Sequence, residues 1–233
     1  MEFAPYWCVI PAAGSGSRLG GTLPKQYLPV LGRALLERTM ERIASHPRIA
    51  GLMVVLAAAD TRWPGIEQCA GKPVRTATGG AERAHSVRAG LEALCEFVSP
   101  DACVLVHDAA RPAVTHEELT HLIEAGSRHP VGAVLAAPVA DTLKRARADR
   151  VIDATIERGR LWRALTPQMF RLEELLVALA AHPDAAPSDD AQALEAMGRF
   201  PLLVEGSAAN IKVTRAEDLP LIECILRAQG ENP

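Results

Sequence analysis

Hydrophobic positions along the chain fall into short runs that are separated by longer amphipathic segments. The short runs, rich in β-branched and other apolar residues, are Trp7–Ile10, Leu52–Leu56, Cys103–Val106, Val131–Ala136 and Leu202–Val204. Between them, apolar residues recur three or four positions apart, as on one face of a helix, in two sets: Val87, Leu91 and Leu94, then Leu172, Leu175, Leu176 and Leu179. This alternation predicts an α/β fold in which helices flank a mostly parallel, twisted sheet. We expect one domain over residues 1–233.

Two helix starts carry the pattern of a capping box, in which a threonine and a glutamate three residues later satisfy each other's backbone donors. They are Thr115 with Glu118, and Thr214 with Glu217, although Pro220 makes the second one less clear.

One segment interrupts the alternation. Asp141–Arg163 holds six arginines, one lysine and only scattered apolar residues, and it can form a hairpin that turns near Ala148 and Asp149. We interpret residues 139–165 as a β-arm that protrudes from the domain.

Composition narrows the classes of partner. The net charge is only −3 and charges of one sign do not cluster in blocks, so we expect no nucleic-acid partner. The longest apolar run, Ile49–Ala59, is shorter than the ~18 residues that a membrane span needs, so we expect no membrane partner. The five cysteines form no C-x-x-C pair, which favours a reducing cytoplasm over a disulfide scaffold or a zinc ribbon.

A loop of small residues, from Pro11 to Gly21, follows the first predicted strand and would let backbone N–H groups approach a phosphate chain closely. The loop lacks the third glycine of the dinucleotide fingerprint and the G-K-[ST] of a Walker A loop. Pro24 and Pro29 predict that Thr22–Val30 stays an open loop rather than a long helix. Because Phe3–Leu36 contains no acidic residue, its cations would attract a polyanion; they are Arg18, Lys25 and Arg33. Taken alone, the loop can also be a plain connector with solvated basic side chains.

A carboxylate, Asp108, follows the run Cys103–Val106, and the carboxyl ends of strands are where open α/β sheets bind ligands. Asp108 is a candidate magnesium contact, or a turn aspartate that bonds its own backbone. His107 has no partner in a metal-ligand or catalytic motif and is interpreted as a structural side chain.

These segments together resemble a known family. The match is carried by Pro24-Lys25-Gln26-Tyr27-Leu28, Gly79-Gly80-Ala81-Glu82-Arg83 with Ser86, His107-Asp108-Ala109-Ala110-Arg111-Pro112, Asp141-Thr142-Leu143-Lys144-Arg145, Leu161 to Gln168, and Asn210-Ile211-Lys212-Val213-Thr214. The chain resembles the 2-C-methyl-D-erythritol 4-phosphate cytidylyltransferases of isoprenoid synthesis.

The resemblance implies a Rossmann-like nucleotidyltransferase fold, Mg²⁺, and transfer of CMP from CTP to a small sugar-alcohol phosphate with release of pyrophosphate. It implies catalytic roles for Arg18, Lys25 and Lys212. The nucleotide site would comprise Pro11, Ala12, Ala13, Gly14, Ser15, Gly16, Gly79, Gly80, Ser86, Asp108 and Ala109, with Asp108 also at the metal. The acceptor site would comprise Arg111, Thr142, Arg158, Thr166 and Lys212. The arm would cross to the partner subunit of a homodimer.

Several alternatives stay open at this point. A relative with the same loop motifs uses ribitol 5-phosphate, and another sugar-nucleotide pyrophosphorylase would share the fold and the metal. A dinucleotide oxidoreductase would need an acidic residue ~20 positions after the glycine loop, where only Glu37 lies, on a predicted helix. A non-catalytic nucleotide-binding module would need neither Lys25 nor Lys212.

Overall fold

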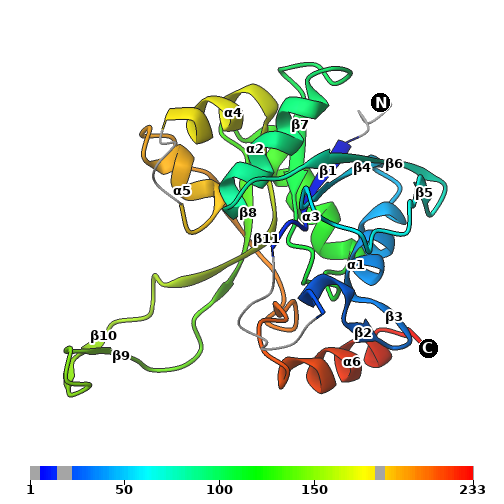
Figure 1. Ribbon diagram of the computed structural model, residues 1–233. Helices are drawn as coiled ribbons and strands as arrows, with labels where there is room; N and C mark the ends of the chain where they lie inside the picture. Colours follow the sequence, from blue (N-terminus) through cyan, green and yellow to red (C-terminus); the bar gives the residue numbers. More distant parts are fainter. Residues whose placement is uncertain (1–5, 15–22, 182–186, 233) are drawn as a thin grey trace.

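The computed structural model describes residues 6–14, 23–181 and 187–232. Within them, eight strands form one mixed sheet in the order β12-β8-β11-β7-β1-β4-β6-β5 (Figure 1). The strands are β1 (Tyr6–Pro11), β4 (Ile49–Leu56), β5 (Gln68–Cys69), β6 (Lys72–Thr78), β7 (Cys103–Val106), β8 (Ala133–Pro138), β11 (Trp162–Arg171) and β12 (Leu202–Glu205). Adjacent pairs are parallel except where β11 meets β7 and β8 and where β5 meets β6. The predicted α/β class and mostly parallel sheet are therefore confirmed.

Alternate side chains of the central strands pack into cores on opposite faces of the sheet. On one face, Cys8, Leu52 and Leu105 pack with the apolar stripes of α1 (Leu35–Ala44) and α3 (His116–Arg128). On the other face, Val9 and Val104 pack with α2 (Arg83–Leu94), α4 (Leu172–Ala181) and α5 (Asp190–Glu195). Since both faces are covered, the strands carry continuous apolar runs, which is why the sequence pattern revealed them.

Strands β6 and β11 were not predicted, because neither carries a continuous apolar run. The side chains of β6 are largely exposed near an edge of the sheet. Strand β11 contains Pro167, and its pairing with β8 shifts register between Ala164 and Gln168, as expected where proline interrupts a ladder.

The segment after the glycine loop is not wholly open. It contains a 3₁₀ turn at Lys25–Tyr27 and a two-residue strand β2 (Pro29–Val30), which pairs with β3 (Arg33–Ala34). No long helix forms over residues 23–30, the described part of this segment, in agreement with the prediction from the two prolines. The turn is short because Pro24 and Leu28 at its ends are both extended.

The two predicted capping boxes have different outcomes. The box of Thr115 and Glu118 is present at the start of α3. The box at Thr214 and Glu217 is wrong, since the N-cap of α6 (Asp218–Ala228) is Glu217, three residues after Thr214, and its side chain makes no capping bond. The carboxylate of Asp218 accepts hydrogen bonds from the backbone N–H of Thr214 at 2.7 Å and of Arg215 at 2.9 Å.

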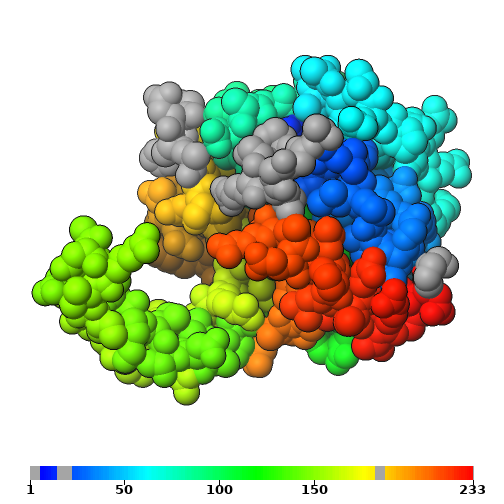
Figure 2. All heavy atoms as spheres, turned by 60° about the horizontal axis from the view of Figure 1, so that its bottom comes forward, coloured from blue at the N-terminus to red at the C-terminus, as the bar shows by residue number. Residues whose placement is uncertain are grey.

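The arginine-rich segment contains a hairpin made of β9 (Leu143–Ala146) and β10 (Ile152–Ile156), which form a sheet of their own. The hairpin stands well away from the body of the domain (Figure 1), and open space separates much of it from the body in the space-filling view (Figure 2). Its side chains are largely exposed, Ile152 by 60%. The predicted segment ended too late, because Trp162 and Arg163 already pair with β8 in the main sheet.

No helix within the described ranges is both long and apolar enough to cross a lipid bilayer.

Candidate active site

A pocket of about 460 Å³ lies where β1, β6 and β7 end. Open α/β sheets bind ligands at the carboxyl ends of their strands, so this is the expected place for a site. Ten of the residues predicted for the site line it: Pro11, Ala12, Ala13, Gly14, Lys25, Gly80, Ser86, Asp108, Ala109 and Lys212. The predicted Ser15, Gly16 and Arg18 lie outside the described residues.

Small residues let three chain segments meet at one wall of the pocket. A Cβ atom on Gly79 would lie 2.7 Å from both the Cβ of Ala13 and the Oγ of Ser86, so only glycine fits there. The Gly79 N–H donates to the Leu56 carbonyl at 2.7 Å and fixes the turn after β6. Gly79 therefore supports the pocket wall from behind, while Gly80 faces the cavity.

The turn that carries Lys25 is tied to Ala12, directly after β1, by a side chain to which the sequence assigned no role. Gln26 is buried, and its Nε2 donates to the Ala12 carbonyl at 2.8 Å. The next residue, Tyr27, donates its hydroxyl to Asp60 Oδ2 at 2.8 Å. These two bonds anchor the turn that places Lys25 at the pocket, and the Pro24–Leu28 motif was the signal that could have identified Gln26.

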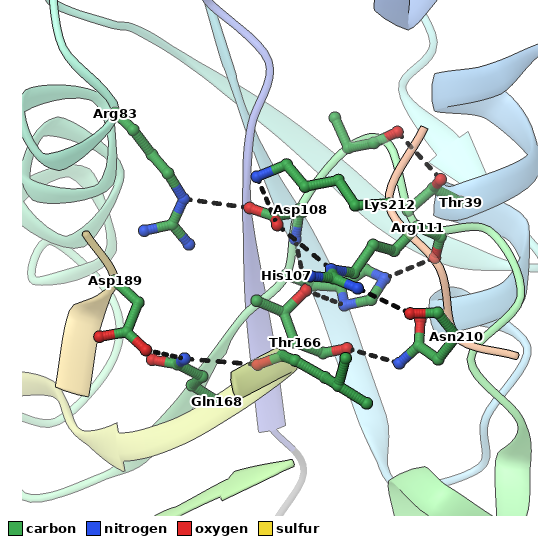
Figure 3. Close-up of polar contacts among 12 residues, drawn as sticks. Thr39, Arg83, His107, Asp108, Arg111, Thr166, Gln168, Asp189, Asn210 and Lys212 are labelled. Atoms are coloured by element: carbon green, nitrogen blue, oxygen red, sulfur yellow. Dashed lines mark hydrogen bonds and ion pairs between the residues drawn. The ribbon is translucent and has the colours of Figure 1, made fainter. Parts of the chain in front are cut away.

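Asp108 lies at the centre of a cluster of cations (Figure 3). Its Oδ1 accepts from Arg83 Nε at 3.0 Å, and its Oδ2 lies 2.8 Å from Lys212 Nζ and 3.3 Å from Arg111 Nε. Burial alone would raise the pKa of Asp108, but the charges of Arg83, Lys212 and Arg111 outweigh burial and hold this pKa well below its usual range. The carboxylate is therefore ionised at neutral pH.

His107 supports the Asp108 loop through a chain of hydrogen bonds. Its Nε2 lies 2.9 Å from the Arg111 carbonyl, which can only accept, so this nitrogen carries the proton. The Thr166 hydroxyl can then donate to Nδ1 at 3.0 Å while it accepts from the Asp108 N–H at 3.0 Å. Burial lowers the pKa of His107 to about 4. The imidazole is neutral and fully engaged, as its interpretation as a structural residue requires.

Four residues predicted to bind the acceptor do not line the pocket of their own chain. Arg111 and Thr166 are buried behind Asp108, and Arg111 also donates to the Asn210 carbonyl at 2.6 Å. Thr142 and Arg158 lie in the exposed arm, on either side of the hairpin strands. Conversely, Arg83 and Ser188 line the pocket without having been assigned a role from the sequence.

A metal ion would find few protein ligands here. Among the described residues, no group of three or more histidine, cysteine or acidic side chains can hold one. The acidic residues of the pocket lining are Glu82 and Asp108, and Asp108 already faces three cations. Such a donor set fits Mg²⁺ only if substrate phosphates and water supply most of its ligands, which is a common arrangement for this ion.

A sheet-end pocket with a small-residue loop, a lysine-bearing turn and a cluster of cations around one carboxylate defines a nucleotidyltransferase-type α/β protein. Comparison with known proteins identifies the family. The family model for 2-C-methyl-D-erythritol 4-phosphate cytidylyltransferase matches residues 6–228. The chain belongs to this family, and the predicted resemblance is confirmed.

Individual relatives match this chain along nearly its whole length. A 2-C-methyl-D-erythritol 4-phosphate cytidylyltransferase of Stenotrophomonas maltophilia (strain K279a) is 54% identical over 96% of this chain and 97% of its own length. The enzyme of that name from Xylella fastidiosa (strain M23) is 52% identical over 93% of this chain and 95% of its own length. Among solved structures, a 4-diphosphocytidyl-2C-methyl-D-erythritol synthase is 36% identical with a TM-score of 0.83, over 96% of this chain and 99% of its own. The solved structure of the enzyme from Thermus thermophilus is 35% identical with a TM-score of 0.76, over 96% of this chain and 99% of its own.

Proposed function

We propose that this chain transfers CMP from CTP to 2-C-methyl-D-erythritol 4-phosphate and releases pyrophosphate. The observation that carries the proposal is the joint position of Lys25, Lys212 and Asp108 in one pocket, in a chain that matches the family model over residues 6–228. An acceptor phosphate oxygen attacks the α-phosphorus of CTP, a new P–O bond forms, and the bond to the oxygen that bridges the α- and β-phosphates breaks. The electron pair of that bond leaves with pyrophosphate.

This chemistry needs alignment and positive charge more than proton transfer. A phosphate monoester, with a second pKa of about 6, is already largely a dianion at pH 7 and needs no general base. His107, the histidine next to Asp108, is buried and neutral, and both of its ring nitrogens are hydrogen-bonded. Lys25 and Lys212 instead offset the repulsion between two anions and the charge that develops toward pyrophosphate. Arg18 is assigned to the same task by family membership.

We propose that the reaction uses Mg²⁺, which CTP phosphates, water and Asp108 would hold. When bound, it neutralises phosphate charge and makes pyrophosphate a better leaving group. Asp108 is the buried carboxylate of this pocket that can lie beside it, directly or through water. Asp108 pairs with Lys212 and Arg83, so its first role is to fix the positions of these cations.

The arm is proposed to complete the acceptor site of a second subunit. Thr142 and Arg158 are exposed and do not line the pocket of their own chain, and the hairpin exposes Val151 and Ile152. An isolated two-stranded hairpin is marginally stable in water, so the arm has reason to pack against another chain. A reducing cytoplasmic location is also proposed, since all five cysteines are free.

Pyrophosphate release tests the function directly. Each of the four nucleoside triphosphates is paired with methylerythritol 4-phosphate and with ribitol 5-phosphate. The fastest release is expected with CTP and methylerythritol 4-phosphate; equal or faster release with ribitol 5-phosphate would reassign the acceptor. EDTA should abolish turnover and excess Mg²⁺ should restore it, whereas full activity in EDTA would remove the metal from the proposal.

A further inference from the structure

Arg83 joins the Asp108 cluster to a second buried carboxylate that lies outside the pocket lining. Asp190, in the first turn of α5, is only 1% exposed. Its Oδ1 and Oδ2 accept from Nη1 and Nη2 of Arg83 at 2.9 and 2.8 Å. The third donor of the same guanidinium, Nε, reaches Asp108 Oδ1 at 3.0 Å. Asp190 and Asp108 thus bind different edges of one planar group.

This arrangement leaves the second oxygen of Asp108 for Lys212. A guanidinium prefers a bidentate, fork-like contact with a carboxylate, and Asp190 occupies that fork. Arg83 donates to Asp108 from Nε, at 3.0 Å, while Lys212 Nζ lies 2.8 Å from Asp108 Oδ2. Burial lowers the pKa of Arg83, but the charges of Asp190 and Asp108 outweigh it and hold this pKa above its ordinary value, so the bridge stays charged.

We propose that Asp190 is a positioning residue for the transfer reaction. It holds Arg83 in place, Arg83 fixes the plane of the Asp108 carboxylate, and Asp108 fixes the ammonium of Lys212 at the pocket. Without Asp190, the fork of Arg83 becomes free to turn to Asp108 and to displace Lys212 from it. This role rests on the proposed function, because Lys212 acts on the reacting phosphates there.

The neighbouring residue provides a matched control. Asp189 is the N-cap of α5: its Oδ1 accepts from the Gln192 N–H at 3.0 Å and its Oδ2 accepts from Gln168 Nε2 at 3.0 Å. Asp189→Ala therefore loosens the same helix without removing a bond to Arg83. If Asp190 has a purely structural role, Asp190→Asn and Asp189→Ala should each lose activity in proportion to their loss of stability.

Steady-state kinetics are measured for Asp190→Asn and Asp189→Ala, together with thermal unfolding. We expect Asp190→Asn to lower kcat by about 10- to 100-fold, as misplacement of reacting groups does, with less than about a threefold change in KM for CTP. Asp189→Ala should also lower the Tm, because α5 loses its N-cap, and should keep kcat within about threefold. In an Arg83→Gln background, Asp190→Asn should lower kcat by less than a further factor of about two, because both substitutions break the same contact between Asp190 and Arg83.

A second readout does not depend on turnover. Acylation of Lys212, followed by peptide mass spectrometry, should be faster in Asp190→Asn than in wild type, because the ion pair with Asp108 no longer covers the amine. Lys72, in the distant strand β6, should react equally in both proteins. If wild type released no pyrophosphate, the proposed function would fail, and the labelling would still test the link between Asp190 and Lys212.

If folded Asp190→Asn has the kcat and the Lys212 labelling rate of wild type, the positioning role is overturned. It is also overturned if the losses of kcat in the double variant multiply fully. If Asp190→Asn does not fold, Arg83→Lys serves instead, because a lysine keeps the charge but has no fork to bridge both carboxylates. It should show the same loss of kcat and the same faster labelling, and wild-type values there would also refute the proposal.

Discussion

The ammonium of Lys212 lies 2.8 Å from the Oδ2 atom of Asp108, which joins the segment after β12 to the loop after β7. Asp108 also bonds Arg83 and Arg111, so one carboxylate fixes cations from three parts of the chain. The pocket therefore has a defined positive charge before any substrate binds.

Asp108→Asn should destabilise the fold, because three cations lose a common buried counter-ion. At pH 7 the free energy of unfolding should fall by about 1.5–3 kcal/mol, the range for a hydrogen bond to a charged group. The folded-state pKa of Asp108 lies well below its usual range, so its stabilisation is present above the unfolded pKa of about 3.9 and is lost at lower pH.

Urea unfolding of wild type and Asp108→Asn from pH 3 to pH 8 measures this effect. The difference between the two proteins should stay constant above pH 5 and shrink below pH 4. A difference that grows as the pH falls below 4 would contradict the ion-pair interpretation of the cluster.

His107 should make stability depend on pH in a different window. Its folded-state pKa is about 4 because of burial, against an ordinary value of 6.5. Between these values the unfolded chain takes up a proton that the folded chain does not, so stability falls as the pH drops from 6.5 to 4. His107→Gln should reduce this fall by about 1–3 kcal/mol, at roughly 1.4 kcal/mol per pKa unit.

The measurement is the free energy of unfolding of both proteins at pH 7, 5.5 and 4.5. His46, whose pKa is also lowered to about 4, chiefly by burial, retains its own contribution in the variant, so part of the fall should remain. Identical pH profiles for wild type and His107→Gln would show that His107 does not titrate as its surroundings require.

Lys25→Ala should lower kcat by about 100-fold or more and leave KM for CTP nearly unchanged, if its ammonium meets charge that develops mainly in the transition state. The hydrogen bonds of Gln26 and Tyr27 hold the turn in place, so the substitution should not disorder it. Lys72→Ala, far along β6, is the control and should match wild type. An effect of Lys25→Ala on KM alone would make Lys25 a ground-state binder.

Sequence patterns predicted what local chemistry encodes and missed what tertiary contacts create. The apolar runs, the Thr115 capping box and the motif positions of Lys25 and Lys212 are all readable along the chain. Strand β11 was missed because Pro167 interrupts its pattern, and its partners come from distant segments. The cationic surroundings of Asp108 were missed for the same reason: the motifs give positions but not which side chains face one another. Asp190 belongs to none of the motifs or apolar stripes along the chain, so the sequence pattern gave no sign of its contact with Arg83.

Each active site should combine residues from two subunits if the arm crosses to a partner. Lys25→Ala and Arg158→Ala are each expected to be nearly inactive, because Lys25 lines the pocket and Arg158 belongs to the arm. Mass labelling identifies mixed dimers after subunit exchange. In such a dimer, two-fold symmetry gives one site both defects and the other site neither, so about half of the wild-type activity should return.

The matched control mixes Lys25→Ala with Lys212→Ala. Both residues line the pocket of the same chain, so every site of a mixed dimer keeps one defect and no activity should return. Recovery in the first mixture alone would place Arg158 in the neighbour's site. Mixed dimers of Lys25→Ala and Arg158→Ala that form and stay inactive would mean that the arm serves its own chain's site or none. A chain that forms no dimers at all would refute the shared site directly, because Thr142 and Arg158 would then have no pocket to complete.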